Sequence, residues 1–395
     1  MLLRVIDYVG NPGGGVRFTV EMLRGLRRRV RPQIELVSHA EALERYASLL
    51  GTDRDVRLLD VPPVDAWRSR TLMAGIPGAG PLNMLLGTAR FHHVVAGDLL
   101  DGADTVWFPW VHRHRIPWAR AGRVVATLHD VITIQFPEVA PAWLRRNERE
   151  TVREWLASDA RIAITSNATA TTLDSMFGVP RERLEVIPLS GSHQRPAGAG
   201  ARRTFAFTRS EYLLAPINIT PHKNPEVLLR GLGRTGERHP LVLTGSGMDL
   251  WPPRSARARK LVGLAEQSGF TRDQSIFALG YVDDRAYEQL LDGAWALVMP
   301  TLAEGGGSFP VLEAMTAGIP VIASDIPVMR EMVQRTGGQI LWFDPRDPAD
   351  LAAKLAELEA GYAEYRLRAE RQARSLRLRT WADVAGDYAR LMRLT

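Results

Sequence analysis

The stretch "ALVMPTLAEGGGSFPVLEAMTAGIPVIAS", residues 296–324, holds a strand, a loop, a helix and a second strand in sequence. The apolar runs 296–300 and 320–324 predict the two strands, and both are short enough to be buried. Between them, Pro310 favours the first turn of a helix, and Gly318 ends that helix after about two turns. Parallel strands joined through a helix are the repeating unit of a doubly wound α/β sheet, so the stretch predicts that fold class.

The same alternation of apolar strands and amphipathic helices continues outward in both directions. Further strands are expected at 3–9, 33–38, 55–61, 105–110, 123–130, 161–166, 183–189, 212–218, 240–245, 275–280 and 339–343. The alternation stops only at 190–203, a polar segment without periodicity that is typical of a linker. We therefore predict two facing Rossmann-like domains, 1–200 and 201–376, and a C-terminal helix within 377–395 that packs back on the first. Ligands of such sheets bind outside the carboxyl ends of the strands.

Composition limits the possible functions. The chain has no cysteine, which excludes disulfides and thiolate metal sites and fits a reducing compartment. No apolar stretch reaches the roughly 20 residues of a spanning helix, and the first residues form a strand instead of a signal peptide, so a cytoplasmic protein is expected. Nucleic-acid recognition motifs are absent from the sequence, and no nucleic-acid partner is predicted.

The positive charge is carried almost entirely by arginine, which makes up 47 of the 50 basic residues. Basic runs occur at 24–32, 113–115, 254–260 and 366–379. Solvated helix faces are the favoured interpretation, and attraction to phosphate or to an anionic membrane is the alternative. The run 24–32 and the apolar segment 71–89 together motivate a hypothesis of peripheral membrane association.

The glycine-rich loop that follows the strand 296–300 predicts a ligand site. Glycines let the backbone approach a ligand closely, and the amides of 308–312 at the helix start are expected to seat a phosphate. A carboxylate would repel that phosphate, so Glu313 is expected to bind neutral hydroxyls such as those of a ribose. The alternative is a glycine loop that leads into a surface helix.

Three other stretches carry candidate site residues. Lys223 follows another strand end and precedes a helix for which Asn224 is the expected N-cap, which aims a cation at anionic ligands. The glycine turn "NPGGGVRF" (11–18) permits close backbone approach but is not a dinucleotide fingerprint. His129 ends a strand, where a lone histidine is more often structural than catalytic. No metal-site, P-loop or GxSxG motif is found, and no cofactor is expected.

In this order, the motifs resemble the retaining glycosyltransferases of family GT4, which have the GT-B fold. They are the GGG turn, "LHD" followed by "FPE", "TSNATATTL" (165–173), "VIPL" (186–189), "PHKN", "LTGSG" (243–247), the stretch from "LGYVDD" to "MREMV", and Trp381 in a C-terminal helix. The resemblance implies that Glu313 holds the ribose, Glu304 the donor sugar, and Lys223 the diphosphate, with His129 near the anomeric carbon. Catalytic roles are thereby expected for His129, Glu304 and Lys223. The expected donor-binding residues are Gly14, Gly15, Asn218, Lys223, Glu304, Gly306, Gly307, Ser308, Phe309 and Glu313.

Two departures from the family pattern bear on the donor. Eight residues separate Glu304 from Glu313, where the family usually has seven, and Asn218 and Thr220 lie where an arginine often precedes the lysine. Either Asn218 or Thr220, or an arginine from elsewhere in the chain, is therefore a candidate to contact the phosphates.

The function that the resemblance implies is metal-independent transfer of a hexosyl unit, with retention, from a nucleotide-diphosphate sugar to a saccharide or lipid-linked acceptor. The motifs favour a GDP-linked mannosyl or deoxyhexosyl donor and a role in surface-polysaccharide synthesis. The alternatives are an epimerase or phosphorylase of the same fold, or a non-catalytic nucleotide-sugar-binding protein.

Overall fold

A computed structural model gives the fold of the chain. It describes residues 1–9, 14–51, 55–63, 67–69, 89–91, 93–118, 123–191, 212–235 and 239–394, with backbone only for 67–69 and 89–91. The chain forms two compact units. Unit 1 comprises Met1–Ser190 and Arg379–Thr395, and unit 2 comprises Gly191–Leu378.

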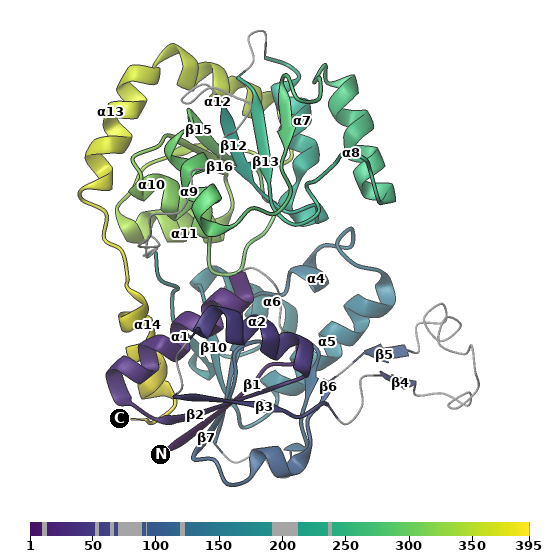
Figure 1. The fold of residues 1–395 in the computed structure, drawn as a ribbon, viewed down its shortest axis with the longest axis vertical. Helices are drawn as coiled ribbons and strands as arrows, with labels where there is room; N and C mark the ends of the chain where they lie inside the picture. The colour runs from purple at the N-terminus through teal and green to yellow at the C-terminus, as the bar shows by residue number, and fades with distance from the viewer. Residues whose placement is uncertain are drawn as a thin grey trace. The chain divides into compact units, whose positions relative to one another are not determined.

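Unit 1 is built on a seven-stranded parallel sheet with the order β11-β10-β9-β7-β1-β2-β3 (Figure 1). Its strands are β1 (Leu2–Ile6), β2 (Gln33–Ser38), β3 (Val56–Asp60), β7 (Thr105–Phe108), β9 (Val124–Leu128), β10 (Arg161–Ile164) and β11 (Leu184–Val186). Its helices include α1 (Gly14–Val30), α2 (Ala40–Leu50), α4 (Ile132–Gln135), α5 (Ala142–Leu156), α6 (Asn167–Phe177) and α14 (Trp381–Leu391). Every residue of the central strands β7 and β9 is buried, as expected for a parallel sheet covered on both faces.

Unit 2 is built on a six-stranded parallel sheet with the order β14-β13-β12-β15-β16-β17. Its strands are β12 (Leu213–Pro216), β13 (Leu241–Thr244), β14 (Ile276–Ala278), β15 (Ala296–Met299), β16 (Val321–Ser324) and β17 (Leu341–Phe343). Its helices are α7 (Pro225–Leu232), α8 (Ala256–Gln267), α9 (Asp284–Asp292), α10 (Phe309–Thr316), α11 (Pro327–Thr336), α12 (Pro348–Ala360) and α13 (Tyr362–Ala373), and the short 3-10 helix η4 covers Pro221–Lys223.

All the strands expected from sequence are present, and the prediction of doubly wound parallel sheets is confirmed. Most are one to three residues shorter than expected at their carboxyl ends, because those residues leave the ladder and form loops. Four short strands of unit 1 were not predicted: β4 (Trp67–Ser69), β5 (Ala89–Phe91), β6 (His93–Val94) and β8 (His114–Arg115). Two to three residues carry too little periodicity to be recognised from sequence. The expected linker 190–203 and the apolar segment 71–89 lie almost entirely outside the described residues.

Helix α14 packs along α1, although the two helices lie at opposite ends of the sequence. Gly25 of α1 faces α14 so closely that a Cβ there would lie 2.7 Å from the Cβ of Ala385. Deeper in unit 1, the hydroxyls of Tyr388 and Thr127 are 2.9 Å apart, and Trp107 Nε1 donates to Thr127 Oγ1 at 3.1 Å. Burial raises the pKa of Tyr388, so this buried network is neutral.

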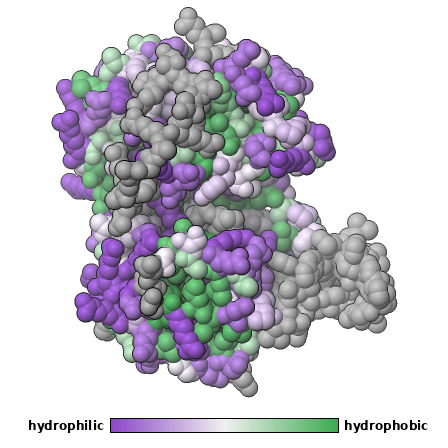
Figure 2. All heavy atoms as spheres, viewed as in Figure 1, coloured by the Kyte–Doolittle hydropathy of each residue, from purple (hydrophilic) through white to green (hydrophobic). Residues whose placement is uncertain are grey.

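Two of the four arginine runs lie on hydrophilic helix faces. The run 254–260 is part of α8 and the run 366–379 begins in α13, and both helices show a largely hydrophilic surface (Figure 2). On α13, Arg366 and Arg368 form i,i+4 ion pairs with Glu370 and Glu364. None of the described helices is long and apolar enough to cross a membrane.

The Gly25–Ala385 contact predicts that Gly25→Ala destabilises unit 1. An added methyl has no space there, and overpacking of this kind costs about 1–3 kcal/mol. The matched control is Gly263→Ala in α8, where a Cβ meets nothing within 4 Å, so helix propensity should make this change neutral or stabilising by up to about 1 kcal/mol. Urea unfolding measures both. Loss of stability no greater in the Gly25 variant than in the control would contradict the α1–α14 contact.

Candidate functional site

The loops that follow β12 and β15 are joined by hydrogen bonds at the carboxyl edge of the unit 2 sheet. The carbonyl of His222 accepts from the amide of Leu302 at 2.7 Å and from Thr301 Oγ1 at 3.1 Å. Thr301 Oγ1 also lies 2.7 Å from the carbonyl of Ala303. Neighbouring strands of a parallel sheet end at the same edge, so residues far apart in sequence meet here.

Lys223 and Glu304 form an ion pair at this junction. Lys223 Nζ lies 2.5 Å from Glu304 Oε1, and the side chains are 19% and 11% exposed. Two residues that the sequence predicted separately are thus brought into direct contact. A partly buried charge pair of this geometry is held more firmly than a surface pair.

Asn224 does not act as the expected side-chain N-cap of α7. Its backbone is left-handed, with φ 55° and ψ 46°, and its side chain makes no capping hydrogen bond. The amide instead donates to the carbonyls of Pro300 at 3.0 Å and Pro345 at 2.7 Å. Asn224 therefore ties the Lys223 turn to the end of β15, and the N-cap prediction is corrected to a loop-bridging role.

Asn218 and Thr220 form a local turn that precedes Lys223. Asn218 Oδ1 accepts from the backbone amide of Thr220 at 3.1 Å and also from its hydroxyl. The oxygen of Asn218 is therefore used within the turn, which leaves its amide group as the donor for any anionic ligand.

Arg257 reaches this loop from elsewhere in the sequence, whereas contact of an arginine with the phosphates stays a prediction. Arg257, from the first turn of α8, donates to the carbonyl of Ile219 and forms a bidentate pair with Glu226 at 3.0 Å for each bond. The hydrogen bonds of its guanidinium to Ile219 and Glu226 thus stabilise the loop. Glu226, in the first turn of α7, also binds Lys260 at 3.5 Å.

His222 is a member of this site that the sequence analysis missed. Its side chain lies next to Lys223 and Arg257, and burial together with these two cations lowers its pKa to about 4. In the described part of the chain, its Nδ1 atom is buried and has no hydrogen-bond partner. A histidine within "PHKN" gave no distinguishing signal, because only the three-dimensional environment reveals the unpaired nitrogen.

Gly307 has a constrained position in the glycine loop. Gly307 has φ 104°, and a Cβ there would lie 2.4 Å from the sulfur of Met332 in α11. Gly307 therefore has to be glycine for both conformational and steric reasons. Gly306 and Phe309, the other predicted loop residues, are partly exposed beside it.

The start of α10 offers fewer amides than expected. The amide of Ser308 lies 3.2 Å from Met332 Sδ, Pro310 has no N–H, and the amide of Leu312 donates to the carbonyl of Ser308. The expected anion seat over 308–312 is therefore narrower than predicted, because the amides of Ser308 and Leu312 already have partners and Pro310 has none to offer. Glu313 lies within this helix and is only 7% exposed.

In unit 1, His129 follows β9 as expected and is buried. Its Nε2 lies 3.0 Å from the carbonyl of Pro109, and its ring stacks on Trp110 at 4.7 Å and meets Phe18 edge-on at 4.7 Å. Burial is the main cause that lowers the pKa of His129 to about 4. A neutral ring that donates through Nε2 keeps Nδ1 as a hydrogen-bond acceptor.

Near His129, and next to Trp110, lies a buried ion pair that the sequence analysis did not predict. His112 Nδ1 is 2.9 Å from Glu148 Oε2, and the His112 ring lies 5.4 Å from that of Trp110. Burial alone would lower the pKa of His112, but Glu148 and Asp130 together outweigh burial, and the pKa is raised. The sequence analysis noted only the basic run 113–115 and not His112, because its partner Glu148 is 36 residues away.

Gly14 and Gly15 begin α1, which places them after β1 as predicted. A Cβ on Gly14 would meet nothing within 4 Å, and the carbonyl of Gly15 accepts from Thr19 Oγ1 at 3.1 Å. The rest of the glycine turn, 10–13, lies outside the described residues. Among the residues that the structure describes, no group of three or more His, Cys, Asp or Glu side chains is arranged to hold a metal ion.

Comparison with known proteins gives two family matches. Residues 12–190 match the model of "Glycosyltransferase Family 4", and residues 202–376 match that of "Glycosyl transferases group 1". O-antigen chain mannosyltransferase B of Escherichia coli is 28% identical over 247 residues, which are 60% of this chain and 61% of that protein. MMP alpha-(1->4)-mannosyltransferase of Mycolicibacterium hassiacum is 27% identical over 389 residues, 85% of each chain. The chain spans less than two thirds of the length of the first relative and about a third of some others.

Solved structures share the fold. HepE of Anabaena in complex with UDP-glucose superposes with a TM-score of 0.65 at 15% identity, covering 100% of this chain and 98% of the other. At this identity the similarity establishes fold only, and it identifies the fold of this chain as GT-B. The two family models together account for nearly the whole chain, one for each half. The chain belongs to the glycosyltransferases of family 4 type, with the GT-B fold.

Proposed function

We propose that this glycosyltransferase transfers a hexosyl unit, with retained anomeric configuration, from a nucleotide-diphosphate sugar. The observation that carries the proposal is the ion pair between Lys223 and Glu304 at the carboxyl edge of the unit 2 sheet, 2.5 Å long and largely buried. It sets a cation beside a carboxylate, as a ligand with a diphosphate at one end and sugar hydroxyls at the other requires. Glu313, buried in α10, is proposed to bind the ribose.

Each proposed role follows from charge. Breaking the bond to the sugar concentrates negative charge on the departing diphosphate, and Lys223 would stabilise that charge more in the transition state than in the ground state. The ion pair with Glu304 orients the ammonium in advance, so little reorganisation is needed. The amide group of Asn218 would supply a neutral donor, since only its oxygen is used within the turn.

His129 is proposed to serve as a neutral hydrogen-bonding group. With its pKa near 4, it carries no charge at pH 7, and its Nε2 is bound to the carbonyl of Pro109. Its Nδ1 is therefore the atom left to accept a hydrogen bond from a sugar hydroxyl. Acid–base catalysis by His129 at neutral pH would be inefficient, because its pKa lies well below the working pH. The leaving phosphate is proposed to remove the proton from the acceptor hydroxyl.

Mannose is the proposed sugar. Two relatives are named mannosyltransferases, whereas the HepE complex contains UDP-glucose but shares only the fold with this chain. Together with the sequence motifs, the names of these relatives support a GDP-linked mannosyl donor and a saccharide or lipid-linked acceptor in polysaccharide synthesis.

Membrane association stays a prediction. In the run 24–32, Arg24 pairs with Glu21 at 2.8 Å and Arg27 pairs with Asp55, so part of its charge is already compensated within unit 1. The apolar segment that motivated the hypothesis lies almost wholly outside the described residues.

Removing either site charge should abolish most transfer. We expect Lys223→Ala and Glu313→Gln each to lower kcat/KM by about a hundredfold or more, the effect of losing one transition-state contact. Lys354→Ala is the matched control, since Lys354 forms an i,i+3 pair with Glu357 on α12. Melting temperatures verify folding, and NMR of the product reports the anomeric configuration. Wild-type turnover in folded variants would refute the assigned roles, and an inverted product would refute retention.

A nucleotide panel should identify the donor base. Thermal shifts with GDP, UDP, dTDP, ADP and CMP are expected to be largest for GDP, because a ligand at 100 times its dissociation constant adds about 2.7 kcal/mol of stability. The shift should disappear in Lys223→Ala and persist in Lys354→Ala. A larger response to another nucleotide would replace GDP in the proposal, and no response to any would contradict a nucleotide site.

The buried neutral histidines predict acid-sensitive stability. The pKa of His129 is about 4 in the folded protein and about 6.5 when unfolded, so the unfolded chain binds its proton first as the pH falls. Stability is therefore full above about pH 6.5 and declines towards pH 4, by about 3 kcal/mol from this group. In His129→Asn, urea unfolding should show a correspondingly smaller fall between pH 7 and pH 4. An identical fall in both proteins would contradict the buried neutral state.

A further inference from the structure

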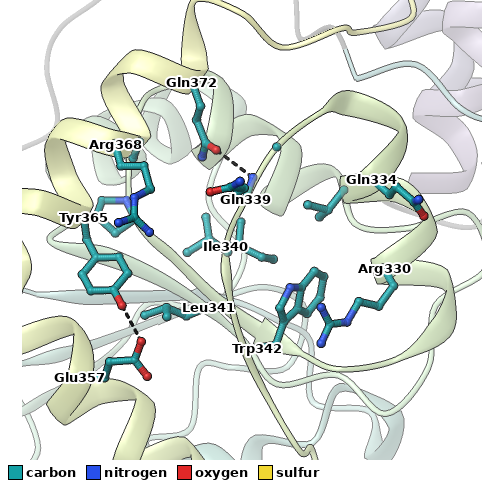
Figure 3. A pocket seen from close by; sticks show the side chains of 15 residues that line it. Arg330, Gln334, Gln339, Ile340, Leu341, Trp342, Glu357, Tyr365, Arg368 and Gln372 are labelled. Atoms are coloured by element: carbon teal, nitrogen blue, oxygen red, sulfur yellow. Dashed lines mark hydrogen bonds between the residues drawn. The ribbon is translucent and has the colours of Figure 1, made fainter.

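A cavity of about 560 Å³ lies within unit 2 between α11, β17 and α13 (Figure 3). Its wall carries Arg330 and Gln334 from α11, Gln339 and Trp342 from the edge of the sheet, and Tyr365 and Gln372 from α13. A volume in this range matches pockets that hold small organic ligands.

This cavity is separate from the proposed donor site. It is lined by residues at the start of β16, Pro320 and Val321, and by 338–342, which lead into β17. Lys223 and Glu304, in contrast, follow the carboxyl ends of β12 and β15. None of the proposed donor-binding residues lines the cavity.

The charged groups of the cavity are already paired. Arg330 forms a bidentate pair with Asp325 at 2.7 Å for each bond, and its hydrogen bonds lower the pKa of that carboxyl. Glu357 accepts from Lys354 at 2.8 Å and from the hydroxyl of Tyr365 at 2.5 Å. An anionic ligand would find no uncompensated cation here, so the lining favours a neutral ligand.

Side-chain amides supply the uncommitted polar groups. Gln372 Oε1 accepts from the backbone amide of Gln339 at 2.8 Å, which leaves the NH2 of Gln372 available. Within the part of the chain that the structure describes, the side chains of Gln334 and Gln339 have no hydrogen-bond partner, and both are exposed. Each amide offers a donor and an acceptor side by side, which matches vicinal hydroxyls that both donate and accept.

Flat apolar surface lies next to these amides. The guanidinium of Arg330 lies over the half-buried Trp342 ring, 4.3 Å from its centre, and that of Arg368 lies over the Tyr365 ring at 5.2 Å. Figure 3 shows the Arg330 and Trp342 side chains next to each other. A pyranose has an apolar C–H face and a rim of hydroxyls. The apolar lining, which includes Ile340 and Leu341, lies beside planar amides and the guanidinium groups over the two rings, and this combination complements both features.

We propose that this cavity is a second carbohydrate-binding site, which takes one or two neutral hexose units of a glycan away from the site of transfer. A peptide strand added to the open edge of β17 fits less well, because α13 walls the cavity and Gln372 already holds the amide of Gln339. The class of ligand follows from the lining. We further suggest that the ligand is the enzyme's own glycan, retained between transfers. This suggestion alone rests on the proposed function.

The test is binding of neutral oligosaccharides to the full chain without nucleotide. Mannotetraose and maltotetraose are titrated by saturation-transfer NMR against wild type and the Gln334→Ala/Gln339→Ala double variant, with inorganic phosphate as the anionic probe. We expect at least one sugar to bind and the double variant to weaken it by about tenfold or more. The control Gln267→Ala/Gln274→Ala changes two exposed glutamines elsewhere in unit 2 and should bind normally.

The outcomes separate this inference from the proposed function. Binding that survives Lys223→Ala but is lost in the cavity variant supports a second site even if transfer is never observed. Unchanged transfer to a monosaccharide acceptor in the cavity variant supports it further. The inference is overturned if neither sugar binds, if the cavity variant binds as wild type does, if the control loses equally, or if phosphate competes.

Discussion

The carboxyl edge of a parallel sheet is the constraint on which the site of this protein depends. Every strand of unit 2 runs in the same direction, so the loops after β12 and β15 must emerge side by side. The carbonyl of His222 and the amide of Asn224 then bond to the neighbouring loop. These bonds place Lys223 within 2.5 Å of Glu304, although 81 residues separate them. Sheet direction therefore creates the contact, and hydrogen bonds make it specific.

Close packing against Met332 requires glycine at position 307 of the glycine loop. The sulfur of Met332 occupies the space that a side chain on Gly307 would need, and the same atom contacts the amide of Ser308. Met332 of α11 therefore packs against the loop at Gly307 and Ser308. The helix that carries Glu313 begins at the next residue, Phe309. Gly307, which lies in the loop between Glu304 and Glu313, is held by this packing against Met332.

Charge is distributed differently in the two units. In unit 2 the proposed donor site and the second cavity both use ion pairs, but the pair of the donor site is largely buried while that of Arg330 with Asp325 is half exposed. In unit 1 a buried His112–Glu148 pair lies near a neutral His129, with Trp110 in contact with both rings. Burial lowers the pKa of one histidine, and a carboxylate raises that of the other. Two similar side chains therefore differ in charge because their partners differ.

The sequence by itself determined the fold class, the position of nearly every strand, the loops that carry Lys223, Glu304 and His129, and the helix that carries Glu313. It could do so because strand periodicity, glycine and proline signals act over a few residues, and because the motif order is specific to a family. Only the tertiary structure decided that Asn224 bridges two loops instead of capping a helix, and that Arg257 holds the turn where an arginine was missing. The structure alone also revealed the unpaired nitrogen of His222. These features depend on partners that are distant in sequence, and no local pattern specifies which distant residue will share a sheet edge or fill a buried space.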